Sequence, residues 1–92
     1  MALIDVVRSL PDLDPEATIY AAKPWTKESS AIVAREPASG ALPAEAERLG
    51  FCYFLEVAIA NEFLAGWLAG FAEHPSVEET CARLVRYAVS DA

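Results

Sequence analysis

The sequence predicts a small α+β domain, in which a three-stranded and at least partly antiparallel sheet packs against two C-terminal helices and a short N-terminal helix. Two observations predict this class: apolar residues recur at helical spacing at both ends of the chain, and short β-forming segments lie between residues 17 and 57. The 92 residues suffice for one domain, residues 1–92, and are too few for two.

The segment Ala2–Leu10 predicts the N-terminal helix. Pro11 ends it, and its apolar residues fall on one face at helical spacing, namely Leu3, Ile4, Val7 and Leu10. The prolines and aspartates that follow predict a turn.

Three segments predict the strands. Ala17–Ala22 and Ala31–Arg35 are short, and the polar connection between them favours an antiparallel pair. In Phe51–Val57, apolar residues fall on both faces of an extended chain, which is typical of a central strand. The pattern therefore favours a central position for this third strand, while the strand order stays open.

The segment Pro43–Leu49 predicts a brief helix before that strand. Proline suits the first helical position, and Gly50 suits a left-handed stop. A continuous helix from Pro43 to Phe71 is the alternative, but Gly50 would interrupt it.

The C-terminal part predicts two helices. The first is Ile59–Phe71, in which large apolar side chains form one stripe. The second runs to about Val89, and Ser76 and Glu79 form a capping box at its start.

Charge and composition narrow the range of partners. The chain has 14 acidic and 7 basic residues, a net charge of −7, which disfavours nucleic acid and anionic membranes. Such a charge would speed the encounter with a basic protein, but solubility is the favoured explanation, since a net charge of this size is ordinary for a small domain. Hydrophobic residues make up 54%, above the usual roughly 45–50%, so either the core is unusually rich in apolar residues or some apolar surface faces a partner.

The sequence also predicts a cytoplasmic, membrane-free protein. Met1–Leu10 lacks the pattern of a signal peptide. Leu49–Ala72 is nearly long enough to span a membrane, but Glu56, Asn61 and Glu62 lie at its centre, where charge is costly.

Two further stretches carry a resemblance. The strand Gly50–Val57, with its Gly-x-x-Tyr-Phe-Leu-Glu-Val pattern, and the ending Tyr87–Ala92, with Tyr-x-x-x-Asp-Ala, resemble a family of small bacterial proteins without an assigned activity. The resemblance implies a small α+β domain. Because some of its members are suspected immunity proteins beside bacterial toxins, it also implies an immunity-like role. It supplies no catalytic residues.

No metal, cofactor or catalytic motif is predicted. Cys52 and Cys81 form no Cys-x-x-Cys pair and fit apolar patterns, so packing is the favoured role. His74 is the only histidine, which excludes a two-histidine metal site, and its place at a helix end favours a structural or solvent-facing role.

Two carboxylates are candidate functional groups. On a central strand, Glu56 would point from an apolar face and would need a partner or a raised pKa. Together with Glu62 it could divide acid and base roles. The favoured alternative is that Glu56 pairs with Arg35 or Arg48 and that Glu62 stabilises the helix start.

A candidate interaction surface surrounds Trp25. This tryptophan follows a proline in a polar connection, and tryptophan is enriched in binding hot spots. Trp67, in contrast, lies on the apolar stripe and is expected in the core. An acidic rim is expected around Trp25, formed by Asp12, Asp14, Glu16 and Glu28.

These features order three functional hypotheses. The leading one is a non-catalytic interaction protein that binds a protein partner, such as a basic toxin in an immunity-like role. The second is a structural homodimer that buries the surplus apolar surface against itself. The third is a small ligand-binding domain or enzyme that uses Glu56 and Glu62.

Overall fold

β1 (Thr18–Ala21) is the middle strand of a three-stranded antiparallel sheet, with β2 (Ala31–Ala34) on one side and β3 (Cys52–Glu56) on the other. The computed structural model describes residues 1–91. The predicted α+β class and the antiparallel pairing of the first two strands are confirmed. All four residues of β1 are buried, as expected for a central strand.

The prediction that the third strand is central was wrong, because β3 lies at an edge of the sheet. Its pairing with β1 shifts at one point: Ile19 lies opposite Leu55, whereas Tyr20 lies opposite Tyr53. Phe54 is the extra residue of this bulge, so alternation breaks there. Phe54 and Leu55 are both buried as a result, and this local irregularity explains the apolar residues that appear on both faces.

α1 (Leu3–Ser9) and the 3-10 helix η1 (Leu10–Asp12) form the N-terminal unit, close to the predicted helix. Leu3, Val6 and Val7 are buried in the main core. Pro11 lies in the first turn of η1, where its missing amide proton is tolerated, and the α-helix has ended by then.

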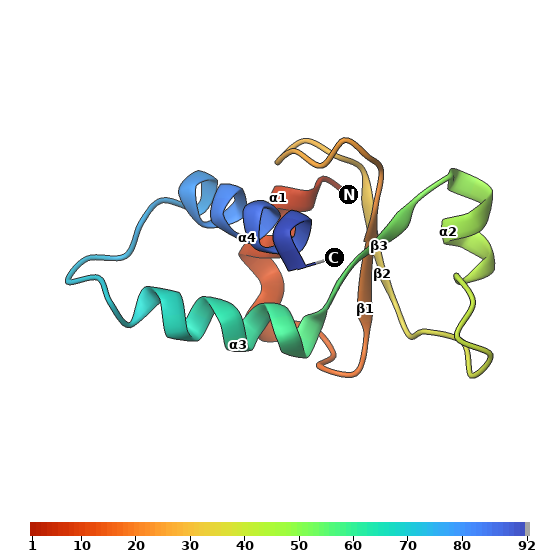
Figure 1. Ribbon diagram of the computed structural model, residues 1–92, viewed down its shortest axis with the longest axis horizontal. Helices are drawn as coiled ribbons and strands as arrows, with labels where there is room; N and C mark the ends of the chain where they lie inside the picture. The colour runs from red at the N-terminus through yellow and green to blue at the C-terminus, as the bar shows by residue number, and fades with distance from the viewer. Residues whose placement is uncertain (92) are drawn as a thin grey trace.

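α2 (Ala44–Leu49) is the predicted brief helix, and the alternative of one continuous helix was wrong. Gly50 ends α2 with a left-handed φ of 75°, a conformation that favours glycine. α2 covers the sheet face opposite the other helices (Figure 1). There Ala46 and Phe51 pack with Tyr20 in a small second core.

α3 (Val57–Leu68) follows β3 without a loop, and α4 (Val77–Asp91) returns beside it. α3 ends before the predicted boundary at Phe71. The predicted capping box is confirmed: the Glu79 amide donates to Ser76 Oγ over 3.1 Å, and the Ser76 amide donates to Glu79 Oε1 over 3.3 Å.

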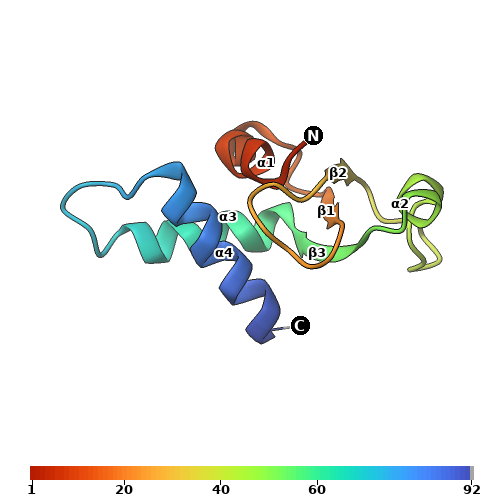
Figure 2. The ribbon, with the colours of Figure 1, turned by 90° about the horizontal axis from the view of Figure 1, so that it is seen from above.

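α1, α3 and α4 form a helical layer on one face of the sheet, as Figures 1 and 2 show. The main core lies between this layer and the sheet. The α3–α4 hairpin extends well past the sheet, which gives the molecule extents of 42 × 23 × 23 Å. Much of the hairpin surface is therefore uncovered by the rest of the chain. Within residues 1–91, no helix has the length and apolarity that a membrane span requires.

Candidate functional site

Glu56 is exposed at the junction of β3 and α3. The expectation that it points from an apolar face was wrong, because the bulge at Phe54 changes the orientation of the residues after it. The expected ion pair is absent as well. Arg35 pairs with Asp14 at 2.9 Å, and Arg48 lies 3.9 Å from the carboxylate of Glu45, its neighbour in α2.

Glu62 lies in the second turn of α3 and is also exposed. It lines a shallow surface groove with Ile59, Phe63 and Gly66, and Glu56 does not line that groove. The structure therefore does not place the two carboxylates in one cavity, where acid and base roles could be divided between them.

Trp25 is half-buried. Its Nε1–H donates to the carbonyl oxygen of Ala21 over 3.2 Å, and its ring meets Phe54 edge to face with centroids 4.9 Å apart. Lys23 Nζ lies 5.0 Å from the ring centroid. Much of this side chain therefore serves to cover the core, and only part of it remains for a partner.

The acidic residues expected around Trp25 are not gathered there. Asp14 and Glu16 lie in the segment before β1, where both pair with Arg35, whereas Trp25 lies in the segment after β1. These segments are at opposite ends of the strand (Figure 1). Asp12 ends η1, on the side of Asp14, and only Glu28 shares the connection that carries Trp25.

An acidic tyrosine face, consisting of Tyr53, Glu36 and Glu56, forms on the sheet face that α2 only partly covers. Tyr53 is 40% exposed, and its ring meets that of buried Tyr20 edge to face, with centroids 6.5 Å apart. Partial burial raises the pKa of the Tyr53 hydroxyl, and the negative charges of Glu56 and Glu36 raise it further. The strand register agrees with this grouping, because Thr18 of β1 lies opposite Glu56 on one side and opposite Ala34, two residues before Glu36, on the other.

Neither carboxylate of this face is neutralised within the described chain. Among residues 1–91, no lysine or arginine nitrogen lies within 4.0 Å of Glu36 or Glu56. Both side chains are exposed. The sequence points to Glu56 but not to its association with Tyr53 and Glu36, since that association depends on the bulge and on the pairing of β3 with β1.

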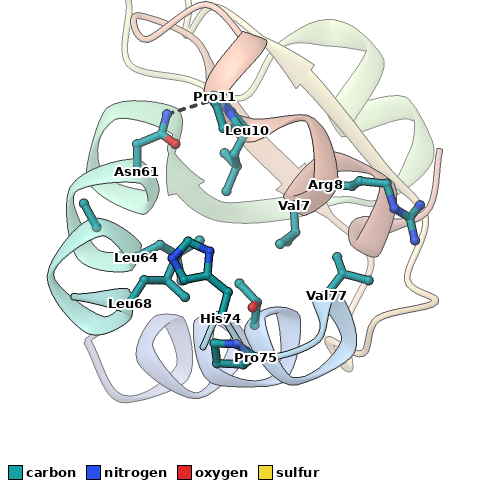
Figure 3. A pocket seen from close by; sticks show the side chains of 12 residues that line it. Val7, Arg8, Leu10, Pro11, Asn61, Leu64, Leu68, His74, Pro75 and Val77 are labelled. Atoms are coloured by element: carbon teal, nitrogen blue, oxygen red, sulfur yellow. Dashed lines mark hydrogen bonds between the residues drawn. The ribbon is translucent and has the colours of Figure 1, made fainter. Parts of the chain in front are cut away.

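A groove of about 450 Å³ lies between α1, η1, α3 and the start of α4 (Figure 3). Its lining is mostly apolar, with Val7, Leu10, Leu64 and Leu68 among its walls. Asn61 Nδ2 donates to the carbonyl oxygen of Leu10 over 3.2 Å.

The ionisable groups of this groove are few. His74 extends over it from the connection before α4, whereas the guanidinium of Arg8 points away from it and pairs with Asp5 (Figure 3). Among the residues that the structure describes, none of those lining the groove carries a carboxylate.

The two cysteines differ in environment. Cys81 is completely buried, and burial raises the pKa of its thiol, which lowers its reactivity. Cys52 is half-buried at the start of β3. Within the described residues, no group of three or more histidine, cysteine, aspartate or glutamate side chains could hold a metal ion.

Comparisons with protein-family models, with curated proteins and with solved structures found no match to this chain. The chemistry of its own surfaces is therefore the basis for assigning a function. Of these surfaces, the acidic tyrosine face combines an exposed aromatic ring with unpaired charge.

Proposed function

We propose that this chain is a non-catalytic protein-interaction module that binds a basic protein through the acidic tyrosine face. The observation that carries the proposal is the position of Tyr53, 40% exposed and close to the unpaired carboxylates of Glu36 and Glu56. Tyrosine is enriched in binding hot spots because it offers a large, rigid contact area and a polar hydroxyl. The neighbouring carboxylates would bind lysine or arginine side chains of the partner.

The charge of the whole molecule supports the same kind of partner. All acidic side chains from Asp5 to Glu79 are exposed, and the net charge is −7. Such a field attracts a basic protein and accelerates its association, and added salt screens it. An immunity-like role, with a basic toxin as the partner, is the finer form of the proposal that the sequence resemblance supports. A cytoplasmic location, where thiols stay reduced, accords with the two free cysteines.

The alternative of an enzyme or ligand-binding domain built on Glu56 and Glu62 has less support. Glu62 lines a groove on α3 and Glu56 does not, so no common cavity would hold a substrate between them. Binding through an exposed surface requires no such cavity.

Affinity capture tests the proposal. The tagged chain is the bait in a lysate of its source cells, and bound proteins are eluted with increasing salt and identified by mass spectrometry. We expect one basic protein, released by salt, on the wild-type bait. The triple variant Tyr53→Ala, Glu36→Gln, Glu56→Gln should lose it.

The matched control is Glu73→Gln with Glu78→Gln, which removes the same number of charges from the α3–α4 connection and the first turn of α4, outside the acidic tyrosine face. This control should retain the partner. Equal loss from both variants would show that only net charge matters. Retention of the partner by the triple variant would show that the acidic tyrosine face is not the binding surface.

A further inference from the structure

A second surface lies on the α3–α4 hairpin. The outer hairpin face consists of Ile59, Glu62, Phe63 and Gly66 of α3 with Arg83 and Tyr87 of α4. Phe63 stacks on Tyr87 with centroids 4.1 Å apart, and the Arg83 guanidinium carbon lies 4.8 Å from the Phe63 centroid. None of these six residues is fully buried, and a shallow groove of about 620 Å³ runs along α3.

α3 carries more apolar surface than the rest of the chain covers. Its 12 residues include a single charged side chain, Glu62, whereas a surface helix usually carries a charged or polar face. Ala58, Ala65 and Gly66 are exposed on it, so the uncovered side offers small residues beside the half-buried rings of Phe63 and Trp67. Small residues beside large rings form grooves and ridges that suit packing against another helix.

Gly66 has no role that the isolated chain explains. A glycine inside a helix costs about 1 kcal/mol relative to alanine. Its φ is not positive, and a Cβ added there would meet nothing within 4 Å. Glycine on an exposed helix face does allow the backbone of a second helix to come close.

The charges of the outer hairpin face favour a copy of the same chain as its occupant. Glu62 and Arg83 are one acid and one base, and among the described residues neither forms an ion pair within 4.0 Å. In a two-fold arrangement that sets α3 of each copy against α4 of the other, Glu62 of each copy meets Arg83 of the other. A basic partner would instead meet Arg83 as a like charge.

We infer that the outer hairpin face is a homodimer interface, in which two α3–α4 hairpins form a four-helix bundle with paired Glu62 and Arg83. This interface is separate from the acidic tyrosine face. A dimer would therefore display two copies of that face.

Molar mass in solution, measured by light scattering after size exclusion, tests this inference. The wild-type chain of 9.9 kDa should show twice that mass at about 100 µM, a concentration well above the Kd expected of a micromolar dimer. Glu62→Arg alone and Arg83→Glu alone place like charges across the interface, so each should shift the protein to a monomer. The double variant restores opposite charges and should restore the dimer.

Two further variants separate interface effects from folding. Gly66→Gln fits the isolated chain, since nothing lies within 4 Å of the new Cβ, but should obstruct the approach of the second hairpin. Glu47→Arg on α2 changes an exposed charge away from the hairpin and should remain dimeric. Circular dichroism would verify that all variants are folded.

A wild-type mass of one chain at every concentration would overturn the inference. A dimer that persists in Glu62→Arg, Arg83→Glu and Gly66→Gln would overturn the assigned interface. Partner capture with the Tyr53 variants is a separate readout, so failure of the dimer and failure of the proposed function are distinguishable.

Discussion

The rings of Phe63 and Tyr87 stack with centroids 4.1 Å apart and planes inclined by 17°, and this contact joins α3 to α4 at their outer side. Such a pair contributes about 1 kcal/mol beyond its buried area. In a double-mutant cycle of Phe63→Leu and Tyr87→Leu, we expect a coupling free energy of about that size. Denaturant unfolding at one fixed protein concentration measures it, and strictly additive single effects would show that the stack contributes nothing of its own.

The capping box of α4 gives a second prediction. Ser76→Ala removes the acceptor for the Glu79 amide and should lower the free energy of unfolding by about 1 kcal/mol. Ser90→Ala is the control, because Ser90 is exposed near the other end of the same helix. An equal effect of the two substitutions in thermal or denaturant unfolding would contradict the assigned cap.

Tyr20 is the basis of a third prediction. Its ring is buried between β1 and α2, and its hydroxyl has no hydrogen-bond partner among the described residues. Since an unsatisfied buried hydroxyl is costly, Tyr20→Phe should raise the free energy of unfolding at neutral pH by about 1 kcal/mol. A loss of stability would indicate that the hydroxyl is satisfied in solution.

The pKa of Tyr20 also predicts how the free energy of unfolding changes at alkaline pH. Burial raises the pKa of Tyr20, and the charges of Glu36 and Glu56 raise it further. The nearby side chain of Thr18 offsets part of this rise, although it does not reach hydrogen-bond geometry with the Tyr20 hydroxyl. The unfolded chain therefore releases this proton at lower pH than the folded chain. The stability contribution is complete below about pH 10 and is lost as pH rises through the higher folded pKa.

Unfolding of the wild type and of Tyr20→Phe from pH 8 to 11 tests this dependence. The wild type should lose more stability than the variant above about pH 10, because only the wild type carries the buried phenol of Tyr20. Tyr53, whose pKa is also raised, remains in both proteins, so both should show a smaller loss of stability from its ionisation. Parallel curves for the two proteins would contradict the account.

Cys81 yields a further prediction. Its side chain is completely buried and burial raises the pKa of its thiol, so alkylation requires local or global opening. In a Cys52→Ser variant, iodoacetamide should leave the folded chain unmodified over hours and label it at once in denaturant. Intact mass measures the label, and rapid alkylation of the folded protein would show that Cys81 is accessible.

The helical parts of the fold were predictable because their signals are local. The apolar spacing of α1, the left-handed stop at Gly50 and the capping box at Ser76 each depend on residues within a few positions of one another. The end of α3 at Leu68 was not predicted, since the apolar pattern continues to Phe71 without a clear stop signal.

The position of the third strand was not predictable in the same way. The bulge at Phe54 depends on how β3 pairs with β1, a contact between residues more than 30 positions apart in the chain. For that reason the sequence pattern assigned Glu56 to an apolar face, whereas its side chain is exposed. The grouping of Tyr53 with Glu36 and Glu56 depends on the same pairing.

Site-specific photo-crosslinking tests whether the acidic tyrosine face binds a basic protein. The photoreactive residue p-benzoylphenylalanine replaces Tyr53 in one variant and Phe71, which is 43% exposed in the α3–α4 connection, in the other. In source cells, we expect an adduct between position 53 and one basic protein, and no adduct from position 71. Adducts with the same protein from both positions, or with no protein other than a second copy of the chain, would contradict this expectation.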